Sequence, residues 1–192
     1  RAKLYWNTAH DLDAERKAFY LNFYGPAAAR LESYWEQILA AWAETRVTEH
    51  EFFVIPAVYP RALVTRLGQA LAGPPPPAEP YASRWKFARL GYEVLDAYTA
   101  MLESACSQCD YAAAVRHGER GLAAREQLTA MDDSFTTYRR MPEEGAAYWP
   151  GEVELYRRLA ALPQVARTPL TWSLRRDPDD HGLWQGWGED TG

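Results

Sequence analysis

Residues 80–109 constrain the fold of this chain more than any other stretch, because apolar side chains recur along them at helical spacing without a break. One stripe alternates steps of four and three residues: Tyr81, Trp85, Ala88, Tyr92, Leu95, Thr99, Leu102, Cys106 and Cys109. A second stripe runs beside it: Phe87, Leu90, Val94, Tyr98, Met101 and Ala105. A helix that is apolar over so wide an arc packs against at least two other helices. We therefore expect a helical bundle with this segment at its centre.

Helix signals continue on both sides of the central segment. Asp11 is a predicted N-cap for a helix over residues 13–24, in which Leu12, Phe19 and Phe23 share the expected inner face. Gly25-Pro26 is a helix stop followed by a helix start. Further helices are predicted over residues 26–44, from Tyr59-Pro60 onward, over residues 110–131, in a short piece ending at Tyr138, and from Pro150 onward. The sequence therefore predicts an all-α bundle of about six helices.

The two ends of the chain differ from this helical body. Residues 2–6 form a short strand candidate, and residues 166–192 combine tryptophans, glycines and an Asp-Pro turn that predict turns or short strands. We expect three parts. Residues 1–8 would be the end of a preceding barrel or a linker, residues 9–165 the helical bundle, and residues 166–192 an irregular tail or the start of a truncated β-rich domain.

Composition excludes two classes of partner. The net charge is −5 and no run of Lys and Arg exceeds two, so the chain lacks the basic footprint of a nucleic-acid surface. No apolar run approaches the length of a membrane span. Eight Trp and twelve Tyr are typical of proteins that stack rings on sugars or form large interfaces, although such rings also fill helical cores.

Cys106 and Cys109 have the spacing of a redox motif or of half a zinc site. Both lie on the first apolar stripe, and no second Cys or His pair occurs at ligand spacing. We therefore expect two buried or half-buried thiols, with no metal and no cofactor.

Three residues are candidate substrate contacts: Trp6, Asn7 and His50. Glu49-His50-Glu51 places an imidazole between two carboxylates, which raises a histidine pKa, in a connection expected over residues 46–56. The alternative is a solvated loop. If the strand before Asn7 ended a β/α barrel, its carboxyl end would face an active site. Trp6 would then stack on a sugar, while Asn7 and His50 would bond its hydroxyls; in an isolated strand Trp6 would be a core residue.

Two runs resemble a known family: Ala-Lys-Leu-Tyr-Trp-Asn at residues 2–7 and Phe-Tyr-Gly-Pro-Ala-Ala at residues 23–28. They are similar to the junction of barrel and helical domain in bacterial α-glucuronidase-like glycoside hydrolases, in the subgroup with a domain of unknown function after the barrel. The likeness extends over about residues 1–160 through Val58-Tyr59-Pro60, Arg84 and Arg89-Leu90-Gly91-Tyr92. The tail pattern of Trp172, Asp177-Pro178, Gly182 and Gly186-Trp187 resembles the opening of a β-galactosidase-like jelly-roll domain.

This resemblance implies a helical accessory domain of a carbohydrate-active hydrolase, which supports a barrel active site and takes part in subunit contacts. The catalytic carboxylates would lie on barrel strands that precede Arg1, so no catalytic residue is expected in this chain. The implied partners are the preceding β/α barrel, a carbohydrate bound through the parent enzyme, and a second copy of the chain. A free-standing helical protein-interaction module is the alternative, and it requires an exposed apolar patch on the helices. A thiol or metal enzyme built on Cys106 and Cys109 is the third hypothesis.

Overall fold

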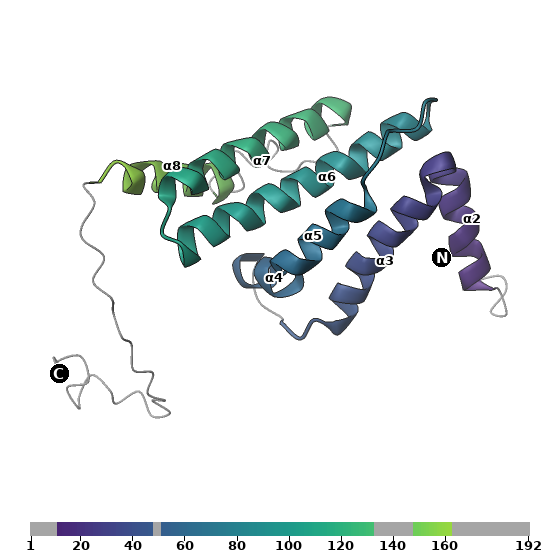
Figure 1. Ribbon diagram of the computed structural model, residues 1–192, viewed down its shortest axis with the longest axis horizontal. Coiled ribbons are helices and arrows are strands. Elements are labelled where there is room, and N and C mark those ends of the chain that lie inside the picture. The colour runs from purple at the N-terminus through teal and green to yellow at the C-terminus, as the bar shows by residue number, and fades with distance from the viewer. Residues whose placement is uncertain (1–10, 48–50, 133–147, 163–192) are drawn as a thin grey trace. The chain divides into compact units, whose positions relative to one another are not determined.

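A computed structural model describes residues 11–47, 51–132 and 148–162, with backbone alone for residues 51–53 and 148 (Figure 1). These residues fall within a compact unit spanning residues 1–162. Its helices are α2 (Leu12–Tyr24), α3 (Ala28–Glu44), α4 (Glu51–Val58), α5 (Arg61–Ala70), α6 (Tyr81–Leu102), α7 (Tyr111–Met131) and α8 (Tyr148–Ala160). A 3-10 turn, η1 (Gly25–Ala27), joins α2 to α3, and a π turn, η2 (Glu103–Ser107), extends α6. The predicted all-α bundle is confirmed, and the described residues contain no strand.

The helix α6 is the centre of the bundle, as the two apolar stripes predict. Ala88 on one side of α6 joins a core formed with α2, α3 and α5, whereas Met101 belongs to a core formed with α7 and α8. Leu90 packs with residues of α7 in a third cluster. Figure 1 shows α6 running between α5 and α7. Both of its apolar stripes are therefore used in packing.

The first core lies between α2, α3, α5 and α6. Its most deeply buried side chains are Leu31 and Leu67, each 0% exposed, and Leu71, 1% exposed. Leu63 and Leu67 face this core from α5. Leu95 of α6 is only partly buried at the edge of this core.

The helix α2 begins and ends as expected. The Asp11 carboxylate accepts a hydrogen bond of 3.0 Å from the backbone N–H of Ala14, which caps the helix. Gly25 ends it with a φ of 52°, a conformation that favours glycine, and a Cβ there would lie 2.8 Å from Cζ of Tyr81. The corner between α2 and α3 therefore sits directly against the start of α6.

The inner face predicted for α2 is wrong for Leu12 and Phe19. Tyr20 and Tyr24 are each 5% exposed, whereas Leu12 is 56% and Phe19 is 50% exposed. Tyr20 and Tyr24 can be buried because each hydroxyl has a hydrogen-bond partner on α3: Glu36 for Tyr20 and Trp35 for Tyr24. On the neighbouring face Phe19 stays near solvent, whereas Phe23 is partly buried against the first core.

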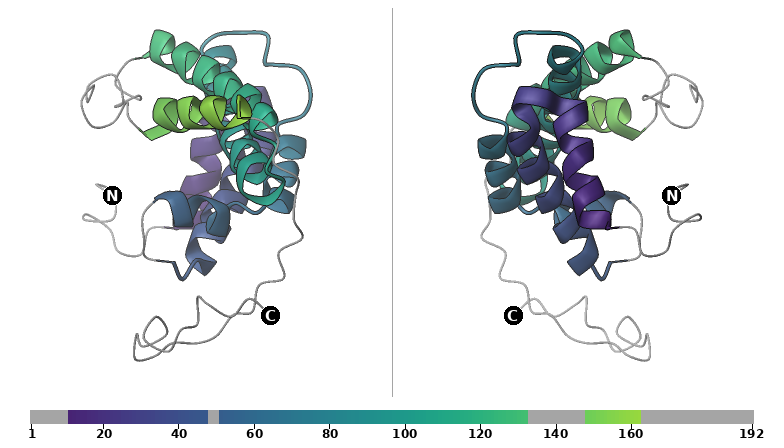
Figure 2. Two further views of the ribbon diagram at one scale, coloured as in Figure 1. Left: turned by 90° about the vertical axis from the view of Figure 1, so that its left-hand side faces the viewer. Right: turned by 90° about the vertical axis from the view of Figure 1, so that its right-hand side faces the viewer.

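The second core joins α8 to α7 (Figure 2). Gly118 and Gly121 of α7 are buried, and a Cβ at Gly121 would collide with the ring of Trp149. Both glycines therefore allow α8 to approach α7 closely. Val153 and Tyr156, 3% and 9% exposed, face this core from α8.

The expected connection over residues 46–56 is wrong in its second half, because α4 occupies Glu51–Val58 with Pro56 inside it. A proline in a helix interior removes one backbone hydrogen bond. Val58 at the end of α4 is 2% exposed, and the backbone N–H of Tyr59 still donates to Ile55. The helix therefore continues through the proline to Val58, the buried residue at its end.

Candidate functional site

The three predicted sugar contacts, Trp6, Asn7 and His50, lie outside the residues that the structure describes. The same holds for the strand candidate at residues 2–6, the short helix ending at Tyr138 and the tail at residues 166–192. These remain predictions. The described helices instead bring together a set of aromatic side chains that the sequence pattern did not single out.

A groove of about 570 Å3 opens between α2, α3, α6 and the end of α7. Its lining is mostly aromatic and aliphatic: Phe19, Tyr20, Phe23, Tyr24, Trp35, Leu39, Ser83, Arg84, Phe87, Met131 and Asp132. We call this feature the aromatic groove. It combines residues from four helices, so no single helical stripe reveals it.

A stacked pair of phenylalanines, one exposed and one partly buried, belongs to the lining of the aromatic groove. The ring centroids of Phe19 and Phe23 are 5.1 Å apart with an interplanar angle of 18°. Phe19 is 50% exposed, and Leu39, also in the lining, is 53% exposed. Large apolar side chains that gather at the surface mark interaction sites more often than single exposed ones do.

Buried tyrosines hold the floor of the aromatic groove. The indole Nε1 of Trp35 donates to the hydroxyl of Tyr24 at 2.8 Å. The hydroxyl of Tyr20 donates to Oε1 of Glu36 at 3.2 Å, and the same oxygen pairs with Nε of Arg16 at 3.2 Å. Burial raises the pKa of Tyr20 to about 12 and also raises the pKa of Tyr24. Both hydroxyls therefore stay neutral near neutral pH.

Arg84 is the positive charge in the lining. Its Nη1 donates to the backbone carbonyl oxygen of Phe23 at 2.9 Å, and its guanidinium carbon lies 4.1 Å from the centroid of the Phe23 ring. The carbonyl belongs to the last turn of α2, where backbone acceptors lack partners within the helix. Arg84 therefore links α6 to the end of α2 and fixes the orientation of the Phe23 ring.

The burial predicted for Cys106 and Cys109 is wrong, because both are free and exposed. The physical reason is the π turn η2, since an extra residue in a helical turn rotates all later side chains around the axis. Cys109 then leaves the helix with a φ of 53°. A thiol enzyme built on Cys106 and Cys109, the third hypothesis, requires thiols that solvent can reach, and both thiols are exposed. Within the described ranges, however, no group of three or more His, Cys, Asp or Glu is placed to hold a metal ion.

No helix in the described part of the chain has both the length and the apolar content needed to span a bilayer. Comparisons with models of known protein families, with curated proteins and with solved structures each find no match. The resemblance to α-glucuronidase-like glycoside hydrolases therefore stays a hypothesis. The fold and the groove together define an all-α domain with an exposed aromatic surface.

Proposed function

We propose that this chain is a non-catalytic helical docking domain, whose aromatic groove receives apolar side chains of a partner protein. The observation that carries the proposal is the stacked Phe19–Phe23 pair in the lining of a groove of about 570 Å3. Phe, Trp, Tyr, Met and Arg are the residue types enriched in the cores of protein interfaces, and the lining contains all of them.

The polar groups of the lining favour an apolar occupant over a carbohydrate. Three of them already bond within the domain: the Tyr20 hydroxyl with Glu36, the Tyr24 hydroxyl with Trp35, and the Arg84 guanidinium with the carbonyl of Phe23. Sugar hydroxyls that enter the groove would lose hydrogen bonds to water and regain few of them, which costs free energy. Apolar side chains carry no such cost. A helix face or a projecting loop with two or three large apolar residues fits the space.

The resemblance to glycoside hydrolases gives the proposal its specific form. The run at residues 23–28 that carries the likeness supplies Phe23 and Tyr24 to the groove and Gly25 to its corner with α6. In this form the chain is the helical accessory domain of such an enzyme, and the partner is its β/α barrel. The alternative is a free-standing interaction module, and the position of the groove on the helices supports that form equally.

A peptide selection tests the docking function. The chain is immobilised, peptides are selected from a random library on phage, and their affinities are measured by fluorescence polarisation against two surface variants. Phe19→Asp places a charge in the groove, whereas Leu155→Asp changes an α8 residue that is 45% exposed and outside the lining. We expect apolar and aromatic peptides that bind Phe19→Asp at least tenfold more weakly and bind Leu155→Asp unchanged.

Three results would overturn the proposal: no enriched peptides, peptides that ignore Phe19→Asp, or oligosaccharides that bind in a manner sensitive to this substitution. Circular dichroism checks that each variant is folded, and Leu39→Asp repeats the test with a lining residue of α3. Isolated barrel domains of α-glucuronidase-like enzymes then serve as candidate partners. Binding that requires Phe19 supports the accessory form, and failure of the barrels alone leaves the module form as the conclusion.

A further inference from the structure

A second cavity, of about 430 Å3, lies where the α4–α5 corner meets the end of α6 and the start of α8. Much of its wall is apolar, from the rings of Tyr59 and Tyr156, the side chain of Leu102 and two prolines, Pro56 and Pro60. The π turn η2 forms one side and carries Cys106 and Ser107 into the lining. π turns occur frequently at functional sites, where they displace a side chain from the helical register. We call this feature the α8 cavity.

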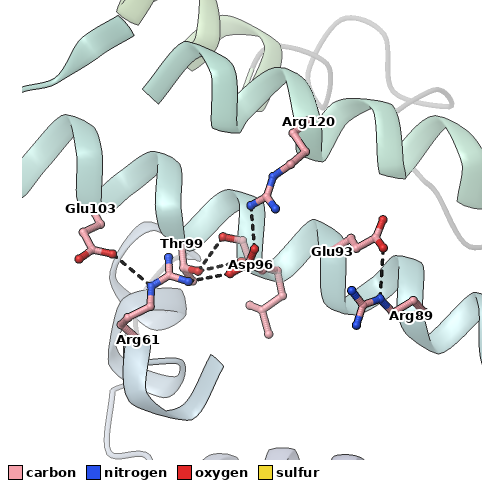
Figure 3. Close-up of polar contacts among 8 residues, drawn as sticks. Arg61, Arg89, Glu93, Asp96, Thr99, Glu103 and Arg120 are labelled. Carbon is pink, nitrogen blue, oxygen red and sulfur yellow. Dashed lines mark hydrogen bonds and ion pairs between the residues drawn. The ribbon is translucent and has the colours of Figure 1, made fainter. Parts of the chain in front are cut away.

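One edge of the α8 cavity is an ion-pair network whose charges compensate one another (Figure 3). Arg61 pairs through Nη1 with Asp96 at 2.7 Å and through Nε with Glu103 at 3.1 Å. Arg120 pairs with the other oxygen of Asp96 at 2.7 Å. Two guanidinium groups therefore face two carboxylates. Two of the three nitrogens of the Arg61 guanidinium are paired with carboxylates, so its charge is already compensated within the network.

Glu152 brings a further carboxyl group to the same cavity from α8. Among the described residues its carboxyl accepts a hydrogen bond from the hydroxyl of Tyr98, and no cationic side chain there forms an ion pair with it. Burial raises the pKa of Glu152 to about 7. The cavity therefore contains a carboxylate whose charge the described side chains do not compensate.

The titratable and charged groups next to Glu152 or in the lining of the α8 cavity come from several elements. Tyr98 stands on α6, Glu103 and Cys106 on the π turn, Arg61 on α5, and Tyr156 on α8 itself. Burial raises the pKa of Tyr156 to about 12, so this ring is neutral near pH 7. Arg61 is the cation among these groups, and its charge is already shared by Asp96 and Glu103. A positive charge that enters the cavity would meet an acceptor without an ionic partner.

We infer that the α8 cavity binds a small organic cation, with its ammonium group against Glu152 and its carbon skeleton against Tyr59 and Tyr156. A carboxylate and an ammonium group form a charge-assisted hydrogen bond in a partly desolvated site. Tyrosine rings attract cations through their faces and also pack against carbon. An anion would meet Glu103 and Glu152 without a free cation to receive it. This inference is independent of the aromatic groove, to which the α8 cavity contributes none of its lining.

A matched pair of probes tests the inference on the full chain by isothermal titration calorimetry. Cyclohexylamine is a cation from pH 5 to pH 8, and cyclohexanol has the same carbon skeleton without the charge. We expect saturable binding of cyclohexylamine at pH 8 and no saturable binding of cyclohexanol. The affinity at pH 5.5 should be roughly 30-fold lower, because an acid with a pKa of about 7 is mostly protonated there.

Two variants on the same helix separate the site from general charge effects. Glu152→Gln removes the uncompensated carboxylate and should abolish cyclohexylamine binding. Glu154→Gln removes an exposed carboxylate that pairs with Arg157 outside the cavity, and it should leave the affinity unchanged. Equal binding of cyclohexanol, retained binding by Glu152→Gln, or no saturable binding of either cyclohexylamine or tetramethylammonium would overturn the inference. Circular dichroism confirms that the variants are folded.

Discussion

The indole N–H of Trp35 donates a hydrogen bond of 2.8 Å to the hydroxyl of Tyr24, and this contact joins α3 to α2 beneath the aromatic groove. Tyr24 is 5% exposed and Trp35 is partly buried, so water replaces neither partner freely. A hydrogen bond in such a place contributes to stability and also fixes the angle at which the two rings meet. The shape of the groove therefore depends on a polar contact inside an apolar surface.

A double-mutant cycle measures this contact. Tyr24→Phe removes the acceptor, Trp35→Phe removes the donor, and the double variant removes both. We expect a coupling energy of about 0.5–1.5 kcal/mol from urea unfolding, as for a typical internal hydrogen bond. Additive effects of the two substitutions would mean that the hydroxyl and the indole do not interact in solution.

Replacement of Gly121 and of Gly91 by alanine should change the stability of the domain in opposite directions. At Gly121 a Cβ would collide with the ring of Trp149, so Gly121→Ala should destabilise the domain by about 1–3 kcal/mol through overpacking. At Gly91, inside α6, nothing lies within 4 Å of the added Cβ. Gly91→Ala should therefore stabilise by about 0.5–1 kcal/mol through helix propensity. Thermal unfolding followed by circular dichroism compares them, and equal shifts would contradict the close contact of α7 and α8.

The raised pKa of Glu152 makes stability depend on pH. Its pKa of about 7 in the folded chain exceeds the ordinary value near 4.5, so folding favours the protonated acid. The stability that the protonated Glu152 contributes to the folded chain is fully present below pH 4.5 and is lost as the pH rises through about 7. A pKa shift of one unit corresponds to about 1.4 kcal/mol of stability. Because Glu152 is partly screened by solvent, its total contribution to the stability of the domain is on the order of 1–2 kcal/mol.

Glu152→Gln removes this titration and should flatten the pH profile. Relative to wild type, the variant should gain stability between pH 5 and pH 8, in urea unfolding at constant ionic strength. A difference between the two proteins that does not change with pH would show that the carboxyl titrates at its ordinary value. Glu154→Gln, on an exposed position of the same helix, serves as the control.

Asp96 should contribute more to the stability of the domain than Glu93, one turn earlier on α6 (Figure 3). The Asp96 side chain pairs with both Arg61 and Arg120 and is 22% exposed, whereas the Glu93 side chain is 38% exposed and pairs with Arg89 one turn earlier on the same helix. We expect Asp96→Asn to cost about 1–2 kcal/mol, because it leaves two guanidinium groups without their shared partner. Glu93→Gln should cost about 0.5 kcal/mol or less.

Salt distinguishes this ionic effect from a change in packing. In 1 M NaCl, where the screening length is about 3 Å, the cost of Asp96→Asn should shrink. An undiminished cost would assign the effect to the shape of the side chain instead.

Much of the helical framework follows from local sequence signals. Asp11 and Asp110 cap their helices through side-chain bonds to backbone N–H groups three residues on. Gly25 breaks the first helix, and the apolar stripes of residues 80–109 place α6 at the centre. These features depend on spacing of a few residues, which is why the sequence alone is sufficient to predict them.

The remaining features depend on tertiary contacts that local spacing does not contain. On α2, phenylalanines and tyrosines occupy adjacent faces, and only the partners on α3 decide that Tyr20 and Tyr24 turn inward. The residues of the π turn after Leu102 continue the apolar spacing of a regular α-helix, yet the turn places Cys106 at the surface. The aromatic groove needs four helices in place. The uncompensated charge of Glu152 is defined by the helices around it and not by its own neighbours in sequence.

The notch that Gly118 and Gly121 form on α7 has a consequence for how the domain can be divided. Trp149 and Val153 of α8 fill the notch, so α8 packs on α7 through two surfaces of complementary shape. A peptide with the sequence of α8 should accordingly recognise a chain shortened before it and restore its fold by fragment complementation. Tryptophan fluorescence would report that reassembly, and Gly121→Ala in the shortened chain would prevent it.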